Sequence, residues 1–293
     1  MVQSFAVPEM LLICVIMLMF IRLFVWEMIK MDLYKWKDHY AVSFEMMDNS
    51  NGFEQFRISN QTGVGSVTAC TVFSGIQVLF NNLKMLQCSN RVKQNKKIIE
   101  MSFCLEGRYE NSWNDRYSFI LSAGDFSVGF AVRKEGGGRF PLRSYKGILL
   151  ILDAEAFSEF HSNILRELEI NLDGIVSLAS RQPHYFKLRS NEELNVILNS
   201  IVSGFAGRNI PQLRIKVLEL LLFLSSPDTT DLKELPAYLN KKNVALAKAV
   251  YAALTQDLSR HLTLEQLAAE FDSGITSLKS HSRVFTASPF TSI

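Results

Sequence analysis

Polar and basic side chains form a regular stripe near the C-terminus, and their types could do recognisable chemistry. The four that recur at i, i+3, i+4 and i+7 are Thr276, Lys279, Ser280 and Arg283. This spacing places them on one face of a helix that begins at Ile275, with Ser277 beside them. Hydroxyl groups and a guanidinium can read base edges in the major groove of DNA, and an ammonium can contact phosphates. The stripe therefore predicts a DNA-binding surface, although such a stripe can also be simply solvated.

The residues before the stripe have the pattern of another short helix and a tight turn. The segment TLEQ from Thr263 to Gln266 is a capping box, with Thr263 as the N-cap of a helix over 264–270. A turn over 271–274 follows, in which Ser273 can cap the next helix. Two short helices joined in this way are typical of a helix-turn-helix. Its predicted core consists of Leu264, Leu267, Ala268, Ile275, Leu278 and Phe285.

The middle of the chain, from about residue 55 to residue 153, has the pattern of strands. Short runs rich in β-branched and aromatic residues are separated by turn residues such as Glu106-Gly107. The runs cover 56–58, 66–73, 76–80, 97–105, 117–121, 126–132 and 147–152. Several short strands at this spacing favour an antiparallel barrel or sandwich, and a barrel offers an interior pocket for a small molecule. Aromatics that could line this pocket, or could be plain core, are Phe103, Tyr109, Trp113, Tyr117 and Phe119.

After residue 153 the hydrophobic period changes to that of helices. Helices are predicted over 154–168, 191–205, 211–224 and 243–258. The third has an apolar face that includes Leu213 and Val217. Ile215, Leu218 and Leu222 extend the apolar surface round this helix. A helix that is apolar on more than one side needs two surfaces to cover it. These could be the barrel and a second subunit, or both could be ordinary core.

The placement of histidine and cysteine bears on whether the barrel could be an enzyme. Metal-binding barrels need several histidines, usually with a carboxylate, around one ion. None of the histidines lies in the strand region; they are His39, His161, His184, His261 and His281. The cysteines are far apart and form no C-x-x-C pair, which argues against a disulfide framework or a thiolate metal site. We therefore expect no catalytic residues, no metal and no cofactor.

Composition and charge describe a folded chain with one unusual segment. The 293 residues are 48% hydrophobic and 20% charged, which excludes a disordered or collagen-like chain. With 31 basic and 29 acidic residues, any nucleic-acid partner must be met by a local surface. The run from Met10 to Trp26 contains only one polar residue, Arg22. It could be a membrane anchor, a buried helix or an overextended start, in which case Met31 is the true first residue and the run is not part of the working protein. Without an anchor, we expect a cytoplasmic protein.

The C-terminal motif resembles a known family. The stretch LTLEQLAAEFDSGITSLKSH, from Leu262 to His281, is similar to the first helix-turn-helix of the AraC/XylS family of bacterial transcription regulators. IPQLRIKVLELLLFL, which begins at Ile210, resembles the helix that precedes this domain. IIEMSFCLEGRYENSW, which begins at Ile98, resembles strands of the family's effector-binding barrel. The resemblance implies a cupin-like ligand-sensing barrel, dimerisation through helices and DNA binding at promoters.

The sequence departs from the family pattern in two places. The family carries two helix-turn-helix units in tandem, and the second is absent from the 293 residues. The family also has an aromatic residue, usually phenylalanine, where Ser282 stands on the predicted buried face. Loss of a phenylalanine-sized group from a core costs about 3–5 kcal/mol. We therefore expect a chain truncated within its DNA-binding domain, in which a single reading helix lowers DNA affinity.

These patterns predict an α+β fold. Its parts are an apolar extension (1–30), an antiparallel β-barrel sensor domain (31–155), a helical linker and dimerisation region (156–240) and a partial helix-turn-helix DNA-binding domain (241–293). The predicted function is AraC-type regulation of transcription, in which sensing of an unknown small-molecule effector is coupled to promoter binding. Expected partners are double-stranded DNA, a second copy of the chain and, for an activator, RNA polymerase. Two alternatives stay open: a truncated sensing and dimerisation module that does not bind DNA by itself, and a barrel enzyme, against which the missing histidines count.

Overall fold

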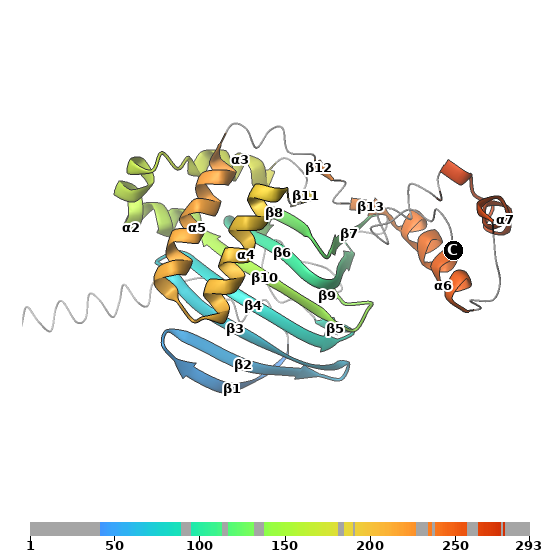
Figure 1. Ribbon diagram of the computed structural model, residues 1–293, viewed down its shortest axis with the longest axis horizontal. Coiled ribbons are helices and arrows are strands. Elements are labelled where there is room, and N and C mark those ends of the chain that lie inside the picture. The colour runs from blue at the N-terminus through green and yellow to red at the C-terminus, as the bar shows by residue number, and fades with distance from the viewer. Residues whose placement is uncertain are drawn as a thin grey trace, which may run out of the picture. The chain divides into compact units, whose positions relative to one another are not determined.

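An antiparallel sheet with helices on one face is the main feature of the protein (Figure 1). The computed structural model describes residues 42–88, 95–112, 117–131, 138–180, 185–189, 191–226, 234–235, 238–256, 263–276 and 278. All of them belong to one compact unit that spans residues 36–293. No helix in this described part is long and apolar enough to cross a membrane. The apolar run over 10–26 lies outside the described residues.

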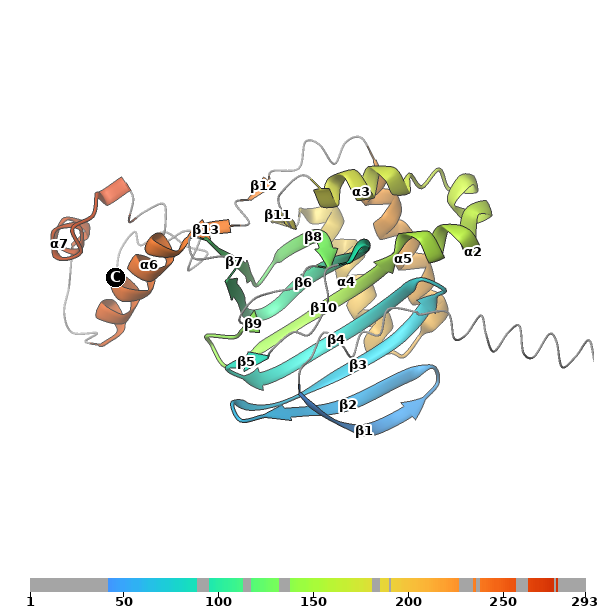
Figure 2. The same cartoon turned by 180° about the vertical axis from the view of Figure 1, so that it is seen from behind.

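The sheet confirms the predicted antiparallel barrel, which it forms as a curled half-barrel (Figure 2). Its strand order is β1-β2-β3-β4-β10-β6-β8-β11-β12, and each paired strand is antiparallel to its neighbour. The bounds are β1 Ser43–Ser50, β2 Phe53–Asn60, β3 Gly63–Phe73, β4 Ile76–Met85, β10 Tyr145–Asp153, β6 Asn95–Ser112, β8 Asp125–Ala131, β11 Tyr185–Arg189 and β12 Glu234–Leu235. Each strand run predicted from the sequence overlaps one of these strands or β7.

Strand β6 belongs to two groups of strands. Its first part pairs with β10 and β8, whereas from Arg108 onward it pairs with β7 (Tyr117–Ser122) and β9 (Gly138–Arg139). Two short strands complete the second group, because β5 (Gln87–Cys88) pairs with β9 and β13 (Tyr238–Asn240) pairs with β7. Gly107 lies at the change, with φ of 82°, and a Cβ there would collide with the carbonyl oxygen of Ser144. A glycine at this position thus allows one strand to serve both groups.

The helices agree with the predicted ones to within two residues at each described end, except for α3, which the sequence pattern does not indicate. Their bounds are α2 Ala154–Glu167, α3 Leu172–Ser180, α4 Glu192–Ala206, α5 Ile210–Ser225, α6 Lys241–Gln256 and α7 Leu264–Glu270. Helices α2 to α5 lie over one face of the sheet (Figures 1 and 2). Asn191 and Asn209 cap α4 and α5, since their side chains accept hydrogen bonds from the backbone N–H groups of Leu194 (2.8 Å) and Gln212 (3.0 Å).

One hydrophobic core joins the sheet to these helices. The predicted apolar face of α5 lies in it, as Leu213, Val217, Leu220, Leu221 and Leu224. The second apolar side of α5 is different, because 65% of Ile215 and 44% of Leu222 are exposed. The described part of the chain therefore covers only the first side.

The predicted pocket aromatics divide between two places. Phe103 packs in the core beneath the helices, which confirms the plain-core interpretation for this residue. Tyr109 lies in an aromatic cluster with ring centroids 6.2 Å from Phe119, 5.8 Å from Phe140 and 6.3 Å from Tyr145. Tyr117 is exposed, and Trp113 is outside the described residues.

His161 interrupts helix α2. Its backbone leaves helical geometry (φ −128°, ψ 21°), and its ring packs 5.1 Å from Phe73 and 4.9 Å from Phe157 between ring centroids. Burial lowers the pKa of His161 below its ordinary value of 6.5, and the positive charge of Arg214 lowers it further. The unfolded chain therefore takes up a proton at this histidine at a higher pH than the folded chain does. Stability is expected to fall as the pH drops from about 6.5 toward the lower pKa of the folded state.

His161→Phe should reduce this acid sensitivity. Phenylalanine does not titrate and can pack against the same two rings. The melting temperature of the variant should therefore fall less than that of the wild type between about pH 7.5 and about pH 5.5. Thermal unfolding followed by circular dichroism at both pH values measures the difference. An equal fall in both proteins would show that another group causes the acid sensitivity.

Candidate nucleic-acid interface

The predicted helix-turn-helix has a small core of its own. Side chains from α6, α7 and the following helical turn meet in it: Val250, Leu254, Leu267 and Leu278 are buried, and Leu246, Ala268 and Phe271 pack against them. Three separate segments thus share one apolar cluster. This arrangement holds α7 and the start of the next helix against α6.

The capping box at the start of α7 is present as predicted. The Thr263 Oγ1 accepts a hydrogen bond from the Gln266 N–H (3.2 Å), and the Gln266 Oε1 accepts one from the Thr263 N–H (2.8 Å). Two backbone donors that a helix start leaves without helical partners are satisfied in this way. The box fixes the first residue of α7 at Leu264, as the sequence predicts.

The turn after α7 reverses the chain through a left-handed residue. Asp272 has φ of 46°, its N–H donates to the Ala269 carbonyl (3.4 Å), and the Ser273 N–H donates to the Ala268 carbonyl (2.9 Å). This pattern is a Schellman motif with Asp272 in the position that glycine usually takes. The next helix follows directly, since the Leu278 N–H donates to the Gly274 carbonyl (3.0 Å). The predicted role of the Ser273 side chain as a cap stays a prediction.

The predicted core residues of the unit are buried to different degrees. Leu267 and Leu278 are each 2% exposed, whereas Leu264, Ala268 and Ile275 are half-buried. Phe285 and Ser282 lie outside the described residues. The described core therefore centres on Leu267 and Leu278.

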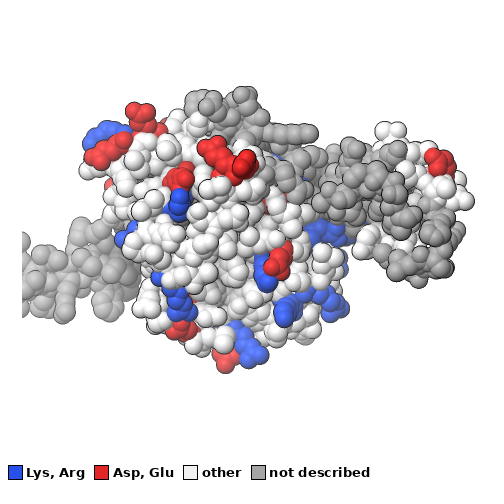
Figure 3. Space-filling model, in the orientation of Figure 1, with Lys and Arg blue, Asp and Glu red and all other residues white. Residues whose placement is uncertain are grey.

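Only the first of the predicted DNA-contacting residues, Thr276, is among the described residues. Thr276 is exposed in the helical turn that follows α7. Ser277, Lys279, Ser280 and Arg283 are outside the described residues, so their roles stay predictions. Among the described residues on the face shown in Figure 3, basic and acidic side chains are interspersed, as the near balance of charge suggests.

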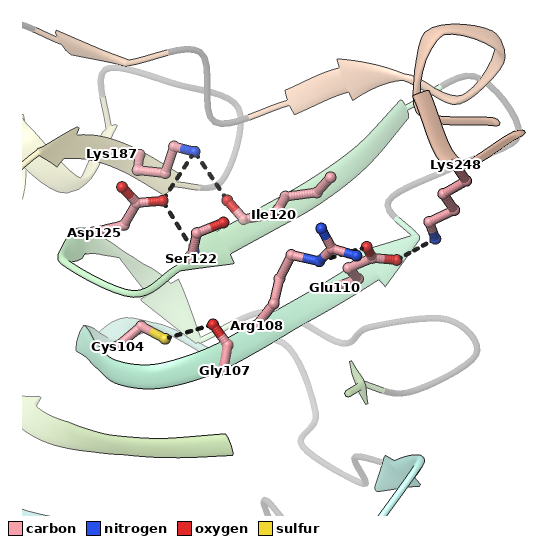
Figure 4. A network of polar contacts seen from close by, with 9 residues as sticks. All are labelled: Cys104, Gly107, Arg108, Glu110, Ile120, Ser122, Asp125, Lys187 and Lys248. Atoms are coloured by element: carbon pink, nitrogen blue, oxygen red, sulfur yellow. Dashed lines mark hydrogen bonds and ion pairs between the residues drawn. The ribbon is translucent and has the colours of Figure 1, made fainter. Parts of the chain in front are cut away.

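A polar junction between the barrel and α6 is the part of the site that the sequence pattern does not indicate (Figure 4). Glu110 of β6 pairs with Arg108 of the same strand (Oε1 to Nε, 3.0 Å) and with Lys248 of α6 (Oε2 to Nζ, 2.5 Å). Arg108 and Glu110 are each only 7% exposed. Alternate charged residues on one strand face were a visible signal, but their partner on α6 is 138 positions away in the sequence.

A second buried ion pair lies beside this junction. Lys187 of β11 is 3.5 Å from Asp125 of β8 (Nζ to Oδ2), and its ammonium also donates to the Ile120 carbonyl of β7 (3.0 Å). Asp125 in turn accepts a hydrogen bond from the Ser122 N–H (2.9 Å). These contacts fix β7 to the main sheet from one side (Figure 4). Arg108 and Glu110 lie on β6, the strand with which β7 pairs.

The cysteines of the described residues do not have the properties of reactive or metal-binding thiols. Burial raises the pKa of Cys70 and of Cys88 to about 12, so both stay protonated. The Cys104 thiol is also buried, and it lies 3.6 Å from the Gly107 carbonyl oxygen as a weak donor (Figure 4). Within the described ranges, no group of three or more His, Cys, Asp or Glu residues could hold a metal ion.

Comparison with known proteins gives structural similarities only. No protein-family model and no curated protein matches the chain. The chain is similar to a crystal structure of ToxT from Vibrio cholerae O395 bound to (E)-4-(8-methylnaphthalen-1-yl)but-3-enoic acid, with 13% identity over 71% of this chain and 75% of that chain and a TM-score of 0.33. Unsaturated fatty acid bound wild-type ToxT from V. cholerae strain SCE256 gives 11% identity over 74% of this chain and 76% of that chain, with a TM-score of 0.33. An oxalate decarboxylase gives 11% identity over 51% of this chain and 43% of that chain, with a TM-score of 0.24.

Proposed function

We propose that this protein is a DNA-binding transcription regulator of the AraC type, which couples the sensing of a small molecule to promoter binding. The observation that carries the proposal is the helix-turn-helix geometry over 263–278. It combines a complete capping box, a left-handed turn at Asp272 and a core shared with α6. In such units the second helix enters the major groove, and residues near its N-terminus contact base edges. A DNA partner also fits a cytoplasmic location, and RNA polymerase would be a partner if the protein activates transcription.

The exposed start of the second helix supports this role. Thr276 is free to meet a base edge or a phosphate because α7 and α6 bury the opposite side at Leu278. The predicted readers Lys279, Ser280 and Arg283 continue the same face in the sequence. A hydroxyl, an ammonium and a guanidinium at these positions supply both phosphate and base contacts.

Buried polar side chains of the sheet support the sensing part. Met101 and Val128 belong to the core beneath the helices, so strand alternation places Glu100 and Ser127 on the opposite face of the sheet. Glu100 is 2% exposed, Ser127 0% and Asn81 5%. Carboxylate, hydroxyl and amide groups held in a rigid sheet can orient a small molecule through hydrogen bonds. We infer that the effector binds on this face.

A DNA-binding titration of the full chain tests the proposal. The probe is a fluorescent double-stranded DNA of mixed sequence, and binding is measured by polarisation at about 50 mM and about 200 mM salt. Specific and non-specific binding both use phosphate contacts, so affinity should fall at least about tenfold at the higher salt. Absence of salt-dependent binding would favour the alternative, a truncated sensing and dimerisation module that does not hold DNA by itself.

Arg283→Ala is expected to weaken binding of this mixed-sequence DNA and to lower the slope of log affinity against log salt concentration by about 1, because one cation on the DNA-facing side is lost. The matched control is Arg57→Ala, which removes the same group from an exposed position on β2 and should leave the affinity unchanged. An equal effect of both substitutions would mean that general charge, and not the helix-turn-helix, attracts the DNA.

The uncovered side of α5 supports a homodimer. Ile215 and Leu222 are 65% and 44% exposed, and Leu218 between them is half-buried. Their spacing of i, i+3 and i+7 is that of a coiled-coil seam, and the same seam on a second copy of the chain would be complementary to it. A second copy of the chain is therefore the proposed occupant of this stripe.

The double variant Ile215→Glu/Leu222→Glu is expected to be monomeric, because two carboxylates cannot be buried in an apolar seam. Both side chains are exposed in the single chain, so the variant should still fold, which its circular dichroism spectrum checks. Sedimentation equilibrium measures the mass of the wild type and the variant. Met47→Glu, at a 58% exposed position on β1, is the control that should not change the mass. A monomeric wild type would contradict the homodimer.

A further inference from the structure

The C-terminal part of the chain joins the barrel at strand β7. Strand β13 pairs with it in antiparallel register, with Tyr238 opposite Phe119 and Asn240 opposite Tyr117. Helix α6 begins at the next residue, Lys241. The chain thus enters α6 directly from a strand that is hydrogen-bonded to the barrel.

The first half of α6 also packs on β7 through side chains. Ile120, which is 0% exposed, forms a hydrophobic cluster with Val244 and Ala247 of α6. Lys248 follows these residues and reaches the Glu110 carboxylate on the neighbouring strand β6. An apolar contact and an ion pair therefore lie next to each other at this junction.

The negative charge of Glu110 offsets two neighbouring positive charges at the junction. Its carboxylate lies between two cations, the buried Arg108 and the Lys248 side chain, which is 43% exposed. Burial lowers the pKa of Arg108, and the electrostatic influence of Glu110 and of Tyr251 on α6 acts in the opposite direction. Without the Glu110 charge, Arg108 and Lys248 would repel each other across the junction.

Helix α6 belongs to both parts of the protein. Val244, Ala247 and Lys248 contact the barrel, whereas Val250 and Leu254 lie in the helix-turn-helix core with Leu267. A helix is a rigid element, so a change at its first half is transmitted to the second. On the barrel side, β6 carries both Glu100 in the main sheet and Glu110 at the junction, on either side of the bend at Gly107.

We propose that the Arg108–Glu110–Lys248 ion triad is a latch, which fixes α6 to β7 and thereby sets the position from which the helix-turn-helix meets DNA. The latch itself follows from the contacts of β6, β7 and α6. Its regulatory consequence rests on the proposed function. In this mechanism an effector bound on the sheet shifts β6, and the shift alters the geometry of Glu110. The ion pair between Glu110 and Lys248 is then either kept, which holds α6 on β7, or broken, which releases α6.

Hydrogen exchange of the full chain tests the latch, with Lys248→Met as the main variant. This substitution leaves the buried Arg108–Glu110 pair neutral and intact, so the barrel should fold normally. The amides of β13 and of the first half of α6 should exchange about fivefold faster than in the wild type. Those of α4 and α5 should be unchanged. Lys242→Met removes the same charge from an exposed position on α6 and is the matched control.

A double-mutant cycle shows whether Lys248 acts through Glu110. In the background of Glu110→Gln, Lys248→Met should produce no further acceleration of exchange. Unchanged exchange in Lys248→Met, or equal acceleration in Lys242→Met, would overturn the latch. Faster exchange in Lys248→Met would support the latch even if the wild type did not bind DNA. The absence of DNA binding would contradict only the proposed function. The two proposals can therefore fail separately.

Discussion

Lys187→Met is expected to lower the free energy of unfolding of the barrel by about 3–5 kcal/mol. Lys187 and Asp125 have side chains that are only 3% and 2% exposed, and their charged atoms are 3.5 Å apart. Methionine fills a similar volume but removes the cation that faces the buried carboxylate. It also removes the hydrogen bond to the Ile120 carbonyl of β7. Most of the cost comes from the Asp125 charge, which the substitution leaves in a low-dielectric environment.

Urea unfolding followed by circular dichroism measures this loss, and an exposed ion pair supplies the control. Lys146 and Glu106 are 2.8 Å apart, but their side chains are 36% and 58% exposed. Lys146→Met should therefore cost less than about 1 kcal/mol. Asp125→Asn combined with Lys187→Met should recover part of the lost stability, because no buried charge is then left facing an apolar side chain. Equal losses for Lys187→Met and Lys146→Met would contradict the role given to burial.

The regular elements could be predicted where local patterns are strong. The long strands β3, β4 and β10 alternate or run as continuous apolar segments, and α4 and α5 show clear helical periodicity. Strand β1 was missed because Met46 and Met47 break its alternation at a bulge. Strand β11 was missed because a buried lysine stands in its centre, and a charged residue suggests a surface. In each case tertiary pairing overrides the local signal.

The candidate site, too, could be predicted only where its contacts join residues that are close in the sequence. The capping box from Thr263 to Gln266 could be predicted to the residue, because both of its hydrogen bonds join positions three apart in the sequence. The latch could not be predicted, since Glu110 and Lys248 meet only when β6 and α6 are placed by the fold. Charge on a strand or a helix is usually solvated, so neither residue indicates its partner. Long-range pairing of this kind is decided by topology, which the local pattern does not contain.

Leu267→Ala is expected to unfold the helix-turn-helix and to abolish DNA binding, while the barrel stays folded. Leu267 is 2% exposed and packs with Val250, Leu254 and Leu278. Replacing a buried leucine by alanine costs about 2–5 kcal/mol, because the lost contacts are not recovered by collapse of the surroundings. This small cluster has few other side chains to share that cost. Residues 263–278 should therefore lose their helical structure at temperatures at which α4 and α5 are still intact.

Three measurements on Leu267→Ala separate the possible causes. The polarisation titration should show loss of salt-dependent DNA binding, and hydrogen exchange should become fast in α7 but not in α4 and α5. Leu267→Met keeps the volume of the side chain, should cost less than about 1.5 kcal/mol and should still bind DNA. Retained binding in Leu267→Ala would place the DNA-contacting surface outside the helix-turn-helix. Fast exchange in α4 and α5 as well would mean that α6 transmits the unfolding to the barrel, so that the latch joins the two parts into one cooperative unit.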